Sequence, residues 1–147
     1  MAAASVALAA GAVRWRYTVV TVRGPSMEPD LADGDRVLVR RCGLRHLRRG
    51  QLVIFREPEP GQRTRPAWLT GATAANTWVI KRVAALPGDP VPESVRAAAG
   101  DADVVPSRSL VVLGSPDFSR DSRHWGCIPA REVLGVGTMR MPLRGEG

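Results

Sequence analysis

Residues 78–89 read WVIKRVAALPGD. The part from Trp78 to Leu86 is rich in apolar and β-branched residues, which favours a strand. Pro87-Gly88-Asp89 then marks a turn, because proline and glycine end regular structure. Lys81 lies inside the apolar part, although the basic residues of this chain are overwhelmingly arginine. The stretch therefore predicts a strand that carries one unusual cation.

Further apolar runs flank this strand on both sides. Each is short and bounded by turn residues, as Gly34 and Asp35 bound the alternating run that follows them. The segment from Glu57 to Asn76 is rich in Pro, Gly and Thr and predicts a long loop. Strands and helices do not alternate as they do in a parallel α/β fold. The sequence thus predicts a mainly β domain, with further strands at residues 16–22, 36–40, 51–55, 110–113 and 133–139.

The composition is that of one folded, basic domain. The chain has 147 residues, of which 44% are hydrophobic, which is enough for one modest core. Its net charge of +7 comes almost entirely from arginine, and several arginines cluster between Arg40 and Arg49. Such a cluster is typical of a solvated turn or of a contact with an anionic surface. No nucleic-acid motif accompanies it and few aromatic residues are present for base stacking, so we expect no nucleic-acid partner.

The N-terminal segment leaves several alternatives open. Residues 1–13 form an Ala-rich apolar run, which is shorter than the roughly 20 residues of a spanning helix. No basic residue precedes the run, as one would in a signal peptide. A membrane anchor, an interfacial segment and a buried helix all remain possible. We expect a short apolar segment over residues 1–15, a catalytic domain over 16–143 and a tail over 144–147.

Two cysteines, Cys42 and Cys127, are too far apart for a CxxC pair. A zinc site is therefore not expected. A disulfide and two free thiols both remain open, since the sequence does not reveal the redox compartment.

Ser26 and Lys81 are candidates for a nucleophile and its base. Ser26 follows a Gly24-Pro25 break that turns the backbone sharply, and a serine hydroxyl needs a nearby base to become a nucleophile. Lysine can lose its proton when an apolar environment disfavours the ammonium, whereas arginine cannot. Ser26 is equally typical of a turn residue, and Lys81 of a strand lysine whose amine reaches solvent.

Two histidines offer an alternative base. His46 lies among arginines and His124 precedes Trp125-Gly126. A Ser-His-Asp triad therefore remains possible on residue types alone, although both histidines also fit surface positions.

Four motifs in order resemble the conserved boxes of the type I signal peptidases (peptidase family S26). Residues 24–31, GPSMEPDL, resemble the serine box, with Asp30 in place of the family's threonine. Residues 34–39, GDRVLV, are similar to the second box, and residues 81–89, KRVAALPGD, to the lysine box. Gly114 with residues 119–126, SRDSRHWG, resembles the last box, although its Gly-Asp-Asn start is rewritten. The resemblance covers most of the chain.

This resemblance implies a role for each matching residue. Ser26 would attack the scissile carbonyl, and Lys81 would take its proton. Ser119 would orient the lysine through a hydrogen bond, while Asp121 and Arg123 would support the site through an ion pair. The backbone N–H of Ser26 would serve the oxyanion hole; the side-chain donor of some relatives is absent, because Gly24 stands at its position. The substrate groove would include Met27 and Pro29.

The resemblance implies a serine endopeptidase with no metal or cofactor. Its fold would be a single β domain like that of signal peptidases and of self-cleaving SOS repressors. Its partner would be a precursor protein with small residues before the cleavage site, bound as an added strand. We expect it at the outer face of the plasma membrane, with the cytoplasm as the alternative. A maturation protease for one partner, such as a nickel superoxide dismutase propeptide, and an inactive binding module remain alternatives.

Overall fold

The computed structural model describes residues 11–25, 27–58, 78–115 and 119–141. Residues 11–16 are helical and lead directly into the first strand. Two four-residue helices and two 3-10 turns connect some of the strands. The elements in chain order are β1 (Tyr17–Thr21), β2 (Arg36–Arg41), η1 (Leu44–His46), β3 (Leu52–Arg56), β4 (Trp78–Ala85), α2 (Glu93–Arg96), β5 (Ser109–Leu113), α3 (Ser122–Trp125), β6 (Ile128–Pro129), η3 (Ala130–Glu132) and β7 (Val133–Met141).

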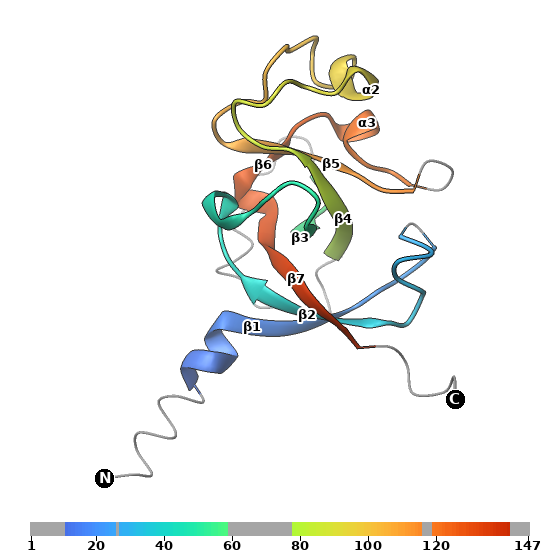
Figure 1. Cartoon of the computed structure of the whole chain (residues 1–147), viewed down its shortest axis with the longest axis vertical. Coiled ribbons are helices and arrows are strands. Elements are labelled where there is room, and N and C mark those ends of the chain that lie inside the picture. Colours follow the sequence, from blue (N-terminus) through green and yellow to red (C-terminus); the bar gives the residue numbers. More distant parts are fainter. Residues whose placement is uncertain (1–10, 26, 59–77, 116–118, 142–147) are drawn as a thin grey trace.

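The strands form one curled antiparallel sheet in the order β1-β2-β7-β3-β4-β5-β6. In Figure 1, β1 and β2 lie at the lower end of the sheet, and β5 and β6 lie at the upper end with α2 and α3. The last strand, β7, inserts between β2 and β3 and joins the two halves. A Cβ at Gly135 would lie 2.1 Å from the carbonyl oxygen of Arg40, so only glycine permits this close approach of β7 to β2.

Apolar side chains of the strands form three hydrophobic clusters. One contains Val37 and Val39 of β2, whose alternation with exposed or half-buried neighbours places every second side chain inside. A second is built around Phe55 and Val133, and Trp125 of α3 packs against it with its ring edge-to-face with that of Phe55. The third fixes α2 through Val95. The ends of the sheet thus each have their own core.

The mainly β fold class that the sequence predicts is confirmed. All six predicted strands are present, with bounds that differ by one or two residues. The short strand β6, both helices and both 3-10 turns were not predicted. Most of the predicted loop at residues 57–76 lies outside the described residues, as does most of the predicted N-terminal segment. Among the helices that the structure describes, none is long and apolar enough to cross a bilayer.

Both cysteines are free thiols. Cys42 is buried in the cluster around Phe55, and Cys127 is half-buried beside α2. Burial raises the pKa of both thiols, because it disfavours the thiolate. The possible disulfide that the sequence left open is therefore absent.

Candidate active site

Lys81 is the only lysine in the sequence, and its side chain is buried to 2% exposure in the middle of β4. It pairs across the sheet with Val53 and is flanked in sequence by the buried Ile80. It forms no ion pair with any described residue. Burial lowers its pKa below 10.5, an effect that the Asp121 carboxylate opposes and the Arg123 guanidinium adds to. The neutral form of the amine is therefore easier to reach than in a solvent-exposed lysine.

Gly114 lets two side chains meet at the end of β5. A Cβ on Gly114 would lie 2.2 Å from Ser119 Oγ and 3.0 Å from Lys81 Cδ. Real Cβ atoms essentially never come within 3.0 Å of another atom, so the Ser119 hydroxyl occupies the space that a larger residue would need, and the Lys81 side chain lies at its edge. The requirement for glycine here is steric. It brings the predicted lysine and its predicted partner into one small volume.

The predicted hydrogen bond from Ser119 to Lys81 is not present. Ser119 Oγ is buried but makes no hydrogen bond. The reason is its direction, because the hydroxyl points at the position above Gly114. A buried hydroxyl without a partner is uncommon and calls for an explanation.

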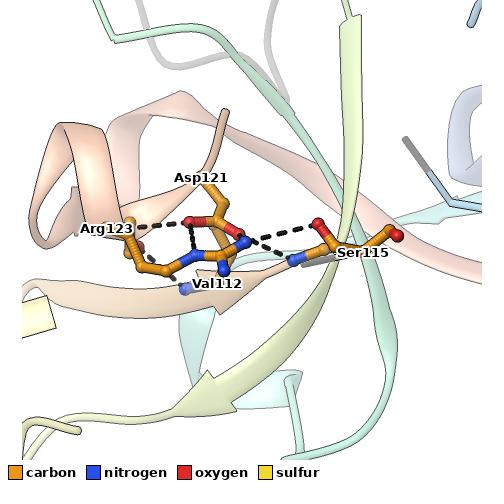
Figure 2. A network of polar contacts seen from close by, with 6 residues as sticks. Val112, Ser115, Asp121 and Arg123 are labelled. Carbon is orange, nitrogen blue, oxygen red and sulfur yellow. Dashed lines mark hydrogen bonds and ion pairs between the residues drawn. The ribbon is translucent and has the colours of Figure 1, made fainter. Parts of the chain in front are cut away.

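Asp121 and Arg123 form the ion pair that the resemblance implies (Figure 2). Arg123 donates from Nε to Asp121 Oδ1 at 3.0 Å and from Nη2 to Oδ2 at 2.7 Å, which is a bidentate pair. Asp121 also caps α3 by accepting from the backbone N–H of Arg123, and it accepts from the N–H of Gly114 at 2.9 Å. Arg123 donates in addition to the carbonyl of Ser115. The pair therefore fixes α3 to the segment that carries Gly114.

The Asp121 carboxylate is a permanent charge in this network. It is fully buried, and burial alone would raise its pKa. The hydrogen bonds from the Arg123 side chain and from the N–H groups of Gly114 and Arg123 outweigh burial and lower its pKa below 3.8. Ser122 adds a further tie, since its Oγ accepts from the N–H of Val112. Asp121 is thus positioned as a structural anion, because it stays ionised wherever Lys81 titrates.

Ser26 itself lies outside the described residues, and the residues on either side of it are well anchored. The N–H of Glu28 donates to the carbonyl of Pro25 at 3.0 Å. Gly24 adopts a φ of +80°, which favours glycine, and its N–H donates to Asp33. Met27, directly after Ser26, is buried.

An ion pair connects this serine loop to the strand that carries Lys81. Asp30, the residue that replaces the family's threonine, pairs with Arg82. Arg82 in turn donates to the carbonyl of Gly50. At the other end of the loop, Arg140 pairs with the buried Asp35 and donates to the carbonyl of Asp30. The loop is thus attached to both β4 and β7.

Met27 and Lys81 line the same cavity, whose volume is about 250 Å³ and whose walls include Trp78 and Trp125. On its other side Met27 lines a second cavity of about 340 Å³, next to Gly114 and Ser115. The predicted groove residue Met27 therefore lies between two small cavities beside the buried amine. Pro29, the other predicted groove residue, lines neither of them.

Comparison with known proteins settles the family. Residues 1–97, about two thirds of the chain, match the family model described as signal peptidase, peptidase S26. The chain belongs to this family. It is similar to a Signal peptidase I of Leptolyngbya laminosa, with 27% identity over 92% of this chain and 74% of that protein. It is also similar to a Probable signal peptidase I-2 of Synechocystis sp., with 29% identity over 78% of this chain and 58% of the relative.

The signal peptidase family model covers the serine and lysine motifs but ends before the segment with Ser119, Asp121 and Arg123. The protein is therefore a signal peptidase relative, and a peptidase at the level of the family. The last motif lies outside the matched residues, and the structure provides separate evidence for it. Gly114, beside which the Lys81 and Ser119 side chains lie, donates its N–H to Asp121, so the last motif reaches the lysine from a part of the chain that is remote in sequence.

The histidine alternative finds no support in this geometry. His46 is exposed and its Nε2 accepts a hydrogen bond from Arg45, while His124 is exposed on α3. Neither lines a cavity with Lys81 or Met27.

Sequence reasoning did not find the steric role of Gly114 or the tie between Asp30 and Arg82. Both depend on contacts between distant segments, and the only sequence signal was the glycine that begins the last motif.

Proposed function

We propose that the protein is a serine endopeptidase that removes leader or signal peptides, with Ser26 as nucleophile and Lys81 as general base. The observation that carries this proposal is the burial of the only lysine in a cavity that it shares with the neighbour of Ser26, with no ion pair to any residue that the structure describes. A lysine whose pKa is lowered by burial can accept a proton that an arginine at the same position could not.

The reaction follows from these roles. Neutral Lys81 Nζ accepts the proton of the Ser26 hydroxyl while Oγ bonds to the scissile carbonyl carbon. The oxyanion that forms accepts from the backbone N–H of Ser26. The lysine ammonium then gives its proton to the departing amine as the peptide bond breaks. Water, losing a proton to Lys81, hydrolyses the acyl-enzyme and frees Ser26.

The residues around the lysine act as positioning groups. Asp121 and Arg123 hold Gly114 and α3 in place through the bidentate pair. Ser119 Oγ has no competing partner, so it is free to turn and accept from Lys81 when the amine is protonated during catalysis. That transient hydrogen bond would stabilise the ammonium only while it forms, which favours the transition state over the resting enzyme.

The substrate would bind along β4. Residues 78–81 pair with β3, whereas β5 pairs only with residues 82–85, so the second edge of this part of β4 has no partner among the described strands. An extended peptide can add to such an edge as a further strand. The two small cavities on either side of Met27 would then accept small side chains before the cleaved bond.

The proposed substrate is an exported precursor, and the proposed site of action is the outer face of the plasma membrane. The similarity of the chain to two proteins named as signal peptidases supports this proposal. No observation on the described residues favours a single dedicated partner or an inactive module, so these alternatives are outcomes of the test below.

The test is cleavage of a leader peptide in which the sequence Ala-x-Ala directly precedes the scissile bond. The unchanged protein should cleave it after the second alanine, and Ser26→Ala and Lys81→Met should reduce the rate by about 10⁴-fold or more. Arg36→Gln, an exposed change on β2 outside both cavities, serves as the matched control. Equal cleavage by all variants would refute the dyad. Absence of cleavage of any leader by the unchanged protein would favour a binding module.

A further inference from the structure

A third and larger cavity lies away from the lysine. Its volume is about 1030 Å³, and it is formed by the end of the N-terminal helical segment, β2, η1 and the segments around β6. It shares no lining residue with either cavity at Met27. In Figure 1 the N-terminal helical segment lies at the lower left, and the loop that carries Ser26 extends to the right of the sheet. The two features therefore occupy different sides of the domain.

Six arginines line this cavity, together with His46 and with no aspartate or glutamate. We call it the basic cavity, and its arginines are Arg16, Arg40, Arg41, Arg45, Arg108 and Arg131. They come from four separate parts of the chain, so the fold itself gathers them. Like charges that share one cavity repel each other within the screening distance of about 10 Å. An anion bound in the cavity would offset that repulsion.

The described carboxylates do not supply this anion. Of the six arginines only Arg131 has an ion pair, with the adjacent Glu132, and Glu132 is also engaged by Arg56. The other five make no ion pair with a described residue. Within Arg41 the Nε atom is buried and makes no hydrogen bond at all. Unpaired guanidinium groups are well suited to phosphate, which they bind through two parallel hydrogen bonds.

Apolar residues at the rim indicate where the phosphate comes from. Trp15, which lines the cavity, is 60% exposed, and Val13, two residues earlier and outside the cavity lining, is 57% exposed. Residues 1–13 contain no charged side chain. Tryptophan beside arginines and next to an apolar segment is the arrangement found where proteins meet the headgroup region of a bilayer. A free phosphate or a nucleic acid would explain the arginines but would leave these exposed apolar side chains without a partner.

We infer that the basic cavity binds the phosphate headgroups of anionic phospholipids and holds this face of the domain on a membrane surface. The inference does not depend on the peptidase proposal, because no residue of the Ser26 and Lys81 region takes part. It also gives Arg40, Arg41 and Arg45, three members of the arginine cluster at residues 40–49, a function that the sequence left open. The five-residue strand β1 connects the helical segment to the loop that contains the serine motif.

The test compares two double variants of the full chain that lose the same charge. Arg45→Gln/Arg108→Gln removes two exposed arginines of the basic cavity, so the fold should be unaffected. Arg36→Gln/Arg48→Gln removes two exposed arginines outside it, neither of which has an ion pair with a described residue. Binding is measured by flotation with vesicles of equal parts phosphatidylglycerol and phosphatidylcholine, and thermal melting checks that both variants fold. We expect the cavity variant to bind about 25-fold more weakly and the control to keep most of its affinity.

Several outcomes would overturn the inference. Equal losses in both variants would show that only net charge matters. Equal binding to vesicles of phosphatidylcholine alone would show that the headgroup charge is irrelevant. Titrations with inorganic phosphate and with a short single-stranded oligonucleotide separate the other sources of phosphate. If either one binds more tightly than the vesicles and loses its binding in the cavity variant, the site belongs to that ligand and the lipid assignment is wrong.

Discussion

Replacing Gly114 by alanine should disrupt the site from within. The added Cβ would lie 2.2 Å from Ser119 Oγ and 3.0 Å from Lys81 Cδ, whereas ordinary contacts begin near 3.4 Å. Ser119 Oγ must therefore move by more than about 1 Å, and the lysine chain must shift as well. Overpacking of this kind lowers the free energy of unfolding by about 1–3 kcal/mol.

The loss of activity should exceed the loss of stability. A displacement of about 1 Å in a catalytic group reduces rates by about 100-fold, so kcat/KM for the leader peptide should fall by that factor at a temperature where the variant is fully folded. Thermal melting and peptide cleavage are measured on the same preparation. Gly43→Ala is the matched control, because its φ is −85° and no atom lies within 4 Å of its added Cβ.

A double variant identifies the clash. Gly114→Ala/Ser119→Ala removes the hydroxyl that the new methyl group would strike, so it should recover much of the lost stability but not the activity. A Gly114→Ala variant that melts and cleaves like the unchanged protein would refute the proposed packing of Ser119 and Lys81 around Gly114.

Three further changes probe the same site. Ser119→Ala should leave the melting temperature unchanged, since no hydrogen bond is lost, but should lower kcat by up to about 100-fold; a parallel fall in stability would show a purely structural role. Asp121→Asn should destabilise by about 2–3 kcal/mol at neutral pH. The pKa of Asp121 in the folded protein lies below 3.8, so its ionised carboxylate stabilises the fold above pH 3.8. This stabilisation is lost as the pH falls through the folded pKa. The free energy of unfolding of the variant, measured by denaturant titration, should therefore depend less on pH in acid than that of the unchanged protein. Lys81→Met should have a higher denaturant midpoint of unfolding than the unchanged protein at neutral pH, because a buried amine is replaced by an apolar group. A lower midpoint would contradict the burial of Lys81 without an ion pair to a described residue.

Local patterns account for the parts of the fold that could be predicted. Val37 and Val39 alternate with less buried neighbours, and a turn glycine precedes them, so the strand is encoded within its own few residues. The strand β6 contains two residues, one of them proline, which is too short for any periodicity. The four-residue α3 owes its position to the Asp121 cap and to its packing against Phe55.

The sequence motifs predicted which residues belong to the candidate site. The way these residues pack together depends on contacts between remote segments. The buried environment of Lys81 follows from its apolar neighbours in β4. The space above Gly114 follows from β4, β5 and the segment before α3 meeting at one point. The basic cavity likewise combines the visible arginine cluster with Arg16, Arg108 and Arg131, which lie far away in sequence. Such contacts are determined by the order of the strands in the sheet, which cannot be predicted from any single stretch of sequence.

The most direct test of the catalytic account is the titration of the Lys81 amine itself. Because Lys81 is the only lysine, selective isotope labelling of lysine gives one side-chain signal in an NMR spectrum, and its chemical shift can be followed against pH in the folded protein. The account predicts a midpoint clearly below 10.5, together with a cleavage rate that rises through the same pH range. A midpoint at or above 10.5 in the folded chain would mean that the amine stays protonated at working pH, and Lys81 would not be the base.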